Sequence, residues 1–275
     1  MTSDQPGEGY LASNRANWDE RTQIHLESRV YDLAGWLREE RGPSQREREA
    51  LGDVSGLSLL HLQCHFGLDT LAWVRAGARV TGLDFSPKAV AAARDIAERA
   101  GLAGRAEFVC ADVHEATQVL GDVTFDVVYV SFGALCWLPS VERWAGQVSA
   151  LVAPGGRFYL HDGHPLAWAL GEDSLVIERG YFEEAAPLVS DSDKTYTDAE
   201  RPIASQRTYQ WNHGIGETVT ALVHNGLRLE WLVEHDWAGW PRFDWLVPNG
   251  EGNWTSPPGV PRVPLSFSLL ASRPV

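Results

Sequence analysis

Short apolar runs alternate with amphipathic stretches over residues 57–162 of the chain. Val, Leu, Tyr and Phe dominate five of these runs, and this composition predicts buried strands with helices between them. The clearest helix start has Ser86 as its N-cap and Pro87 at its first position. Strands and helices that alternate at this spacing predict right-handed crossovers and a parallel sheet with helices on both faces. The expected strands are residues 57–63, 78–84, 106–110, 125–130 and 157–162.

The pattern changes on either side of this segment. Residues 14–37 show a loosely helical spacing of apolar positions, and a charge-dense connector, expected to hold a loop and a short helix, follows them. Apolar positions show no regular period over residues 166–210, and residues 237–263 are rich in Pro and Gly. Both segments are therefore expected to be irregular insertions. The remaining expected elements are a turn at residues 153–156, a helix at 217–225 and strands at 227–235 and 265–272.

Together these elements predict an α/β fold built on a doubly wound, mostly parallel, seven-stranded sheet. We expect residues 1–50 to form an N-terminal helical cap and residues 51–275 to form the ligand-binding domain. The two insertions, near residues 166–210 and 237–263, are expected to act as lids over the carboxyl edge of the sheet.

Composition and charge narrow the possible classes of function. The 275 residues include 23 Lys and Arg against 37 Asp and Glu, which gives a net charge of −14. This charge argues against a nucleic-acid partner, because such a surface needs a cationic footprint. Three scattered cysteines, no signal-peptide pattern and no membrane-length apolar run predict a cytoplasmic protein without a membrane partner. The large insertions could also pair two copies of the chain in a homodimer.

The ends of the expected strands carry the candidate ligand site, because open parallel sheets bind ligands at their carboxyl edge. Asp84 ends the second strand 21 positions after Gln63 (84 − 63), close to the spacing of roughly 20 at which an acid binds a ribose diol. A dinucleotide would need glycines where its pyrophosphate touches the backbone, but Gln63 and His65 occupy two of those positions and only Gly67 remains. An acid that binds a ribose fits either a dinucleotide or S-adenosylmethionine (SAM). Because two of the glycines that a dinucleotide needs are absent, SAM is favoured over NAD or FAD.

The segment LLHLQCHFGLDTLAWVRAGARVTGLDFSPKAVAAAR resembles the first motifs of class I SAM-dependent methyltransferases. It is most similar to a variant group that has LQCHFG in place of the glycine-rich loop. Further pieces that match in order are NWDER, CADV, FDVVY followed by GALCWLP, and LVAPGGRFYL. The chain departs from the common pattern at His61, where the family usually has an acid, and at Gln63 and His65. The resemblance therefore implies atypical contacts to the methionine end of SAM.

The resemblance also implies a role for each strand-end residue. The loop after the first strand would face the methionyl and ribose parts of SAM, and Asp84 would accept from the ribose hydroxyls with Phe85 beside adenine. Asp112 would accept from the adenine amino group, Val113 would offer a backbone amide, and Ser131 would border the sulfonium. The implied cofactor residues are Gln63, Cys64, His65, Gly67, Asp84, Phe85, Asp112, Val113 and Ser131.

Histidines near the expected edge are candidates for a general base, since the pKa of histidine lies close to neutral pH. His164 is the first choice, because the following Pro165 favours an extended backbone at the edge of the sheet. His161 and His213 are the other candidates. The segment HDGH at residues 161–164 could also hold a metal, but neighbouring strand residues point to opposite faces, so no metal is expected.

Tryptophans are frequent outside the strand bodies, and a lid of this composition suits an apolar or aromatic small molecule. We expect Trp18, Trp137 and Trp211 to contact this substrate. The favoured function is SAM-dependent methyl transfer to a small-molecule acceptor at oxygen or nitrogen. The alternatives are a SAM-binding or SAM-sensing module that has lost catalysis and, less favoured, an NAD-dependent oxidoreductase.

Overall fold

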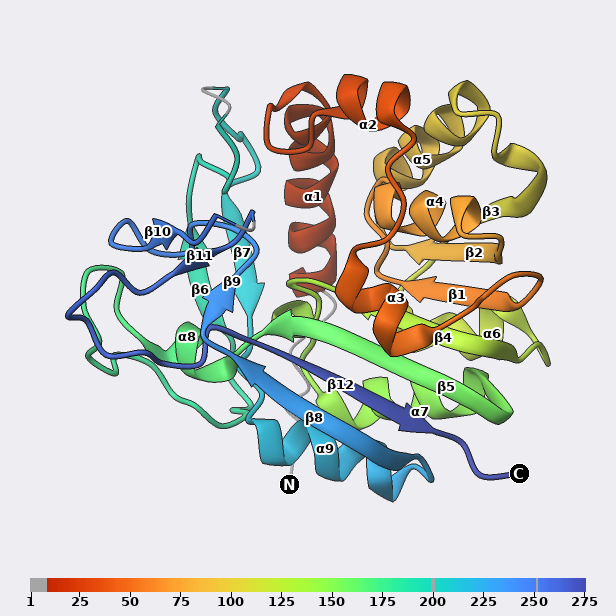
Figure 1. The fold of residues 1–275 in the computed structure, drawn as a ribbon. Helices are drawn as coiled ribbons and strands as arrows, with labels where there is room; N and C mark the ends of the chain where they lie inside the picture. Colours follow the sequence, from red (N-terminus) through yellow and green to blue (C-terminus); the bar gives the residue numbers. More distant parts are fainter. Residues whose placement is uncertain (1–8, 199–200, 251) are drawn as a thin grey trace.

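A seven-stranded sheet forms the centre of the computed structural model, which describes residues 9–198, 201–250 and 252–275 (Figure 1). Its strand order is β3-β2-β1-β4-β5-β12-β8. The first five strands are parallel, and β12 runs antiparallel to both of its neighbours. The predicted doubly wound, mostly parallel sheet is confirmed. Its strands are β1 (Ser58–Leu62), β2 (Arg79–Asp84), β3 (Ala106–Cys110), β4 (Phe125–Ser131), β5 (Val152–Gly163), β8 (Arg228–His235) and β12 (Ser266–Ser272).

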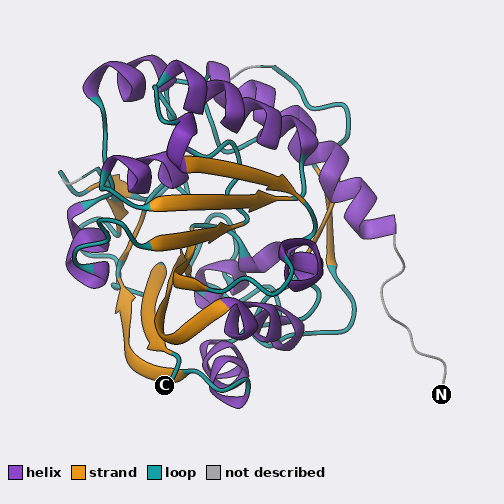
Figure 2. Ribbon diagram, turned by 90° about the vertical axis from the view of Figure 1, so that its right-hand side faces the viewer, coloured by secondary structure: helices purple, strands orange, loops and turns teal. Residues whose placement is uncertain are grey.

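Helices cover both faces of the sheet and create two apolar cores (Figure 2). Successive residues of a strand point to opposite faces, so Val128 and Val130 pack in one core while Val127 and Tyr129 pack in the other. Trp144 is a large residue of the first core and Trp73 of the second. The helices that contribute are α2 (Leu33–Glu39), α3 (Gln45–Leu51), α4 (Leu68–Arg75), α5 (Pro87–Arg99), α6 (Ala116–Leu120), α7 (Val141–Leu151) and α9 (Ile215–His224).

The N-terminal segment forms two helices instead of the single helix predicted at residues 14–37. The first, α1 (Gly9–Glu27), begins earlier than predicted and packs against α5. The second, α2 (Leu33–Glu39), starts after Asp32, which has φ 40° and accepts a hydrogen bond from the Gly35 amide. This left-handed N-cap residue is the physical cause of the break. Residues 1–8 lie outside the described part of the chain.

Strand β5 also differs from its prediction, which placed a turn at residues 153–156. The strand starts at Val152 and contains those residues, because the pairing with β4 shifts register between Phe125 and Val127. Gly156 lies close to the neighbouring backbone, and a Cβ there would be 2.8 Å from the Ala153 carbonyl oxygen. Proline and glycine in this stretch therefore mark an irregular strand and not its absence.

Both insertions lie at the end of the sheet to which the arrows of β1 and β2 point (Figure 1). The first contains α8 (Pro165–Ala169) and an antiparallel hairpin of β6 (Leu188–Asp191) and β7 (Arg207–Gln210). The second forms a small sheet of β9 (Trp237–Ala238), β10 (Val247–Pro248) and β11 (Trp254–Thr255). Residues of both insertions share a third, smaller apolar core that includes Leu170 and Phe243. Among the described residues, no helix is long and apolar enough to cross a membrane.

Candidate active site

A cavity of about 820 Å³ opens at the carboxyl ends of the parallel strands. Its floor is formed by the residues that follow β1, β2, β3 and β4. Helix α1 contributes one face to the wall, because Tyr10, Asn14, Trp18 and Arg21 recur every three or four residues. Both insertions also contribute to the wall, among others through residues 188–196 and 239–242.

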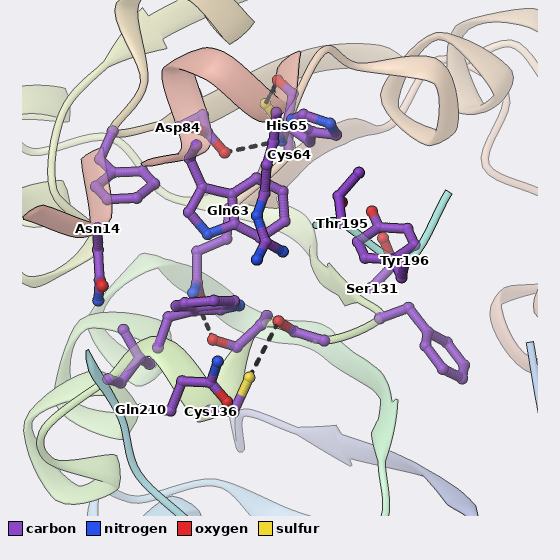
Figure 3. Close-up of a pocket in the computed structure, with 18 of the residues that line it drawn as sticks. Asn14, Gln63, Cys64, His65, Asp84, Ser131, Cys136, Thr195, Tyr196 and Gln210 are labelled. Carbon is purple, nitrogen blue, oxygen red and sulfur yellow. Dashed lines mark hydrogen bonds between the residues drawn. The ribbon is translucent and has the colours of Figure 1, made fainter. Parts of the chain in front are cut away.

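All nine residues that the sequence assigned to the cofactor line this cavity: Gln63, Cys64, His65, Gly67, Asp84, Phe85, Asp112, Val113 and Ser131. Figure 3 shows five of them together with Asn14 of α1 and Tyr196 of the first insertion. The convergence follows from the fold, since the carboxyl ends of parallel strands meet at one edge. Their roles toward SAM stay predictions.

The loop between β1 and α4 has the backbone of a glycine-rich loop although two of its positions with positive φ are not glycines. Gln63 has φ 57° and His65 has φ 50°, which is the left-handed region that costs non-glycine residues free energy. Side-chain contacts stabilise the loop: Gln63 Nε2 donates to the Ala134 carbonyl at 2.9 Å. Gly67 has φ 78°, and a Cβ there would lie 2.7 Å from the Phe108 ring. This position therefore requires glycine.

Asp84 ends β2 and is buried at the edge of the cavity, with 7% of its surface exposed. One carboxylate oxygen accepts from the His65 amide at 2.8 Å (Figure 3). The other accepts from the Ser86 amide at 2.9 Å. Burial raises the pKa of Asp84 to about 6. A carboxylate has about four acceptor sites, so it retains capacity for the two hydroxyl groups of a ribose.

Asp112 and Val113 follow β3 and begin a single 3-10 turn. The Asp112 carboxylate accepts from the His114 amide at 2.9 Å, so it caps this turn while it faces the cavity. A carboxylate has about four acceptor sites, so Asp112 can cap this turn and still accept a hydrogen bond from adenine, as the resemblance implies.

Ser131 at the end of β4 belongs to a hydrogen-bond chain that the sequence did not reveal. Its hydroxyl donates to Asp69 at 3.0 Å, while its oxygen lies 3.2 Å from His61 Nε2. The other ring nitrogen of His61 lies 2.8 Å from the Thr70 hydroxyl. Burial lowers the pKa of His61 to about 3, so the ring is neutral and bridges β1, β4 and α4. At this position, where the family usually has an acid, the chain thus has a buried neutral group.

The three candidate bases do not line the cavity, and this corrects the expectation for His164 in particular. His164 is buried and caps α8, because its Nδ1 accepts from the Leu166 amide at 3.1 Å. Its Nε2 lies 2.8 Å from a carboxylate oxygen of Glu234. The X-Pro junction does force an extended backbone, as expected, but the ring turns into the protein and stabilises the start of a helix.

His213 and His161 are likewise held away from the cavity. Both ring nitrogens of His213 have partners: Nδ1 lies 2.8 Å from Glu183, and Nε2 lies 2.9 Å from the Leu138 carbonyl oxygen. The His161 ring packs against Phe132, and burial lowers its pKa to about 3. Neither arrangement supports a proton acceptor for a substrate. Among the described residues, no group of three or more metal-binding side chains exists.

Two of the three expected substrate tryptophans reach the cavity. Trp18 and Trp137 both line it, and their rings meet edge to face with centroids 5.3 Å apart. Trp211 packs against Tyr10 behind the lining and does not contact the cavity, which corrects that assignment.

The structure adds a second aromatic wall that the sequence could not distinguish from ordinary core. Phe132 and Trp240 meet edge to face at 4.9 Å, and Trp168 lies beside Trp240. Next to these rings, Glu172 binds the guanidinium of Arg242 at 2.6 Å. The aromatic rings therefore make this side of the cavity apolar, and the Glu172–Arg242 ion pair places charge at one end of it.

The sheet order defines an open doubly wound α/β fold, and the cavity lies where the strand order reverses, the usual place for a ligand in such folds. Residues 60–160 match the family model described as a methyltransferase domain. A demethylmenaquinone methyltransferase of Thermus thermophilus is 34% identical over 114 residues, which are 41% of this chain and 48% of that protein. A sterol 4-C-methyltransferase of Caenorhabditis elegans is 26% identical over 103 residues, which are 38% and 30% of the two chains.

A solved structure extends the likeness to nearly the whole fold. A SAM-dependent methyltransferase from Mesorhizobium loti superposes with a TM-score of 0.55 at 22% identity, over 88% of this chain and all of that one. The resemblance to class I SAM-dependent methyltransferases is thereby confirmed, and the chain has their fold. It spans less than half the length of the two curated relatives.

Proposed function

We propose that the protein is an enzyme that transfers a methyl group from SAM to an oxygen or nitrogen atom of a small molecule. The observation that carries this proposal is the convergence of nine strand-end residues on one cavity that also has aromatic walls. The volume of about 820 Å³ lies in the upper part of the range for small-molecule sites, which suits a cofactor and an acceptor together. The named activities of the two curated relatives, on a sterol and on demethylmenaquinone, support a small-molecule acceptor.

The polar groups around the cavity fit SAM. Asp84 and Asp112 have spare acceptor sites for the ribose and the adenine amino group, and Phe85 adds an apolar ring to the lining of the cavity. Gln63 Oε1 and Arg21 Nε are buried polar atoms without a partner among the described residues, so a ligand that satisfies them gains free energy. SAM supplies an electrophilic methyl group on a sulfonium.

The residues of this chain contribute mainly alignment and exclusion of water. Trp18 and Trp137 wall one side of the cavity, and Phe132, Trp168 and Trp240 provide an apolar surface for an acceptor. Positioning alone can lower the barrier of such a displacement by several kcal/mol, on the order of 7 or more. Because His161, His164 and His213 do not line the cavity, we assign the acceleration to alignment and not to any of these three histidines.

The test is a thermal-shift comparison followed by a turnover assay. SAM and S-adenosylhomocysteine should raise the melting temperature and NAD should not, because Gln63 and His65 crowd the place where a pyrophosphate would lie. An extract of small molecules should then yield S-adenosylhomocysteine in the presence of SAM. Stabilisation by SAM without any turnover would favour the sensing module, and stabilisation by NAD alone would favour the oxidoreductase.

A further inference from the structure

Three aromatic rings of the cavity wall, those of Phe132, Trp240 and Trp168, form an aromatic row that none of the proposed cofactor contacts uses. Phe132 and Trp240 meet edge to face with centroids 4.9 Å apart, and the centroids of Trp240 and Trp168 are 6.4 Å apart. Trp168 and Trp240 both lie against Gly163, where an added Cβ would be 3.0 Å from Trp168 Nε1 and 3.6 Å from the Trp240 ring. Phe132 directly follows Ser131, which the resemblance places beside the sulfonium, so the row begins next to the reacting end of the donor.

Arg242 joins the aromatic row to a charged cluster. Its guanidinium carbon lies 5.1 Å from the centroid of the Trp168 ring, and its side chain is only 13% exposed. Its two Nη atoms donate to the two carboxylate oxygens of Glu172 at 2.6 and 3.1 Å. Its Nε is buried and has no hydrogen-bond partner among the described residues. Glu172 therefore uses two of the five N–H donors of this guanidinium and leaves Nε unsatisfied.

The charged side chains that line this end of the cavity do not balance. They are Glu172, Arg179 and Arg242. Arg179 Nη2 donates to the same Glu172 carboxylate at 3.3 Å, and the described part of the chain shows no other side-chain partner for it. Two guanidinium groups thus share one carboxylate, which leaves the cluster with a net charge of +1 (2 − 1). A second carboxylate would neutralise it, and because Arg242 is largely shielded from water, that pair would be worth more than one on the surface.

We infer that the methyl acceptor is an apolar molecule that carries an aromatic ring and a carboxylate group. The carboxylate binds Arg242, with Arg179 as the second cation, and the ring packs on the aromatic row. A planar guanidinium matches a carboxylate through two parallel hydrogen bonds, and Glu172 already shows this geometry at Arg242. This assignment rests on the proposed function, and it makes Arg242 a specificity-determining residue for the acceptor.

The test uses two probes of nearly equal shape, naphthalene-2-carboxylate and naphthalene-2-carboxamide, on protein loaded with S-adenosylhomocysteine. In calorimetric titration the carboxylate should bind about tenfold to a hundredfold more tightly than the carboxamide, the range for a charge-assisted pair. Arg242→Met should lose this preference because the cation is gone, and Arg242→Lys should keep part of it. Arg262→Met is the matched control, since Arg262 is exposed on the same insertion and forms its ion pair with Asp236.

Glu172→Gln distinguishes a binding site from an ion pair that only ties the two insertions together. The neutral amide no longer competes for Arg242, so the carboxylate probe should bind about tenfold more tightly than it does to the wild type, while the carboxamide is unaffected. A variant with lower thermal stability and unchanged affinity for the carboxylate would show a purely structural ion pair and would overturn the assignment.

Trp240→Ala tests the aromatic row separately from the charge. It should weaken both probes by about tenfold, because apolar contact with the ring is lost, and it should leave the preference for the carboxylate in place. Unchanged affinity for both probes would show that their rings bind elsewhere and would contradict the assignment.

The loading step separates failure of this assignment from failure of the proposed function. A wild-type protein that binds S-adenosylhomocysteine but binds neither probe, or binds both equally, overturns the assignment alone. An Arg242→Met variant that keeps the preference for the carboxylate has the same consequence. A wild-type protein that does not bind S-adenosylhomocysteine contradicts the proposed function itself, and the assignment fails with it.

Discussion

The floor and the cover of the cavity are assembled in different ways. The floor consists of the loops after β1, β2, β3 and β4, whose residues are brought together by the parallel sheet itself. The cover consists of α1 and the two insertions, and side chains of α1 donate hydrogen bonds to the backbone of the first insertion. The order and direction of the strands therefore determine where the floor residues lie. The positions of the cover residues depend instead on contacts between segments that are far apart in the sequence.

The contacts between α1 and the first insertion show how the cover is held. Glu20 accepts from the backbone amides of Ala204 and Ser205 at 2.6 and 3.0 Å. Nearer the start of the same helix, the Asn14 side chain accepts from the Tyr209 amide and donates to the Tyr209 carbonyl, both at 2.9 Å. The cover is therefore docked by polar contacts, which a ligand or a mutation can release more readily than an apolar core.

The largest effect is expected in the floor, at Asp84. Asp84→Ala should lower the affinity for SAM by over a hundredfold, because it removes two charge-assisted hydrogen bonds worth about 3 kcal/mol or more together. Titration calorimetry measures this loss. Asp95→Ala is the control, since Asp95 lies on the exposed side of α5 and pairs with Arg99. Unchanged affinity in Asp84→Ala would show that the ribose does not bind at the end of β2, where the topology of the sheet predicts it.

An intermediate effect is expected in the cover, at Glu20. Glu20→Ala should raise the rate of trypsin cleavage between Lys194 and Thr195 by about tenfold, since the hydrogen bonds that dock the β6–β7 hairpin are lost. Glu27→Ala is the matched control, because Glu27 is exposed on the same helix and bonds only to Gln23 among the described residues. Equal cleavage of both variants would mean that packing, and not these polar contacts, holds the cover.

The smallest effect on binding is expected at His164. His164→Ala should cost about 1–2 kcal/mol of unfolding free energy through loss of the helix cap, with SAM affinity and turnover within about twofold of wild type. His164→Asn should recover most of the stability, because asparagine is a good N-cap. Chemical denaturation and initial rates measure the two quantities. A variant of normal stability that loses turnover a hundredfold would restore His164 as the base.

The same contrast explains which features were predictable from the sequence. The seven strands and the nine floor residues could be located because apolar runs and strand ends are local signals. Arg21 and Tyr196 are 175 positions apart (196 − 21), and no local pattern shows that they share a cavity wall. His164 failed for a related reason: its backbone conformation was predictable, but the direction of its ring depends on Glu234 of a distant strand.

A crystal structure of the protein grown with S-adenosylhomocysteine tests the central claim most directly. We expect density for the ribose against Asp84, the adenine between Phe85 and Asp112, and the amino-acid end between the β1–α4 loop and Trp18 of α1. A ligand bound outside this cavity, or inside it with its ribose away from Asp84, would contradict the account.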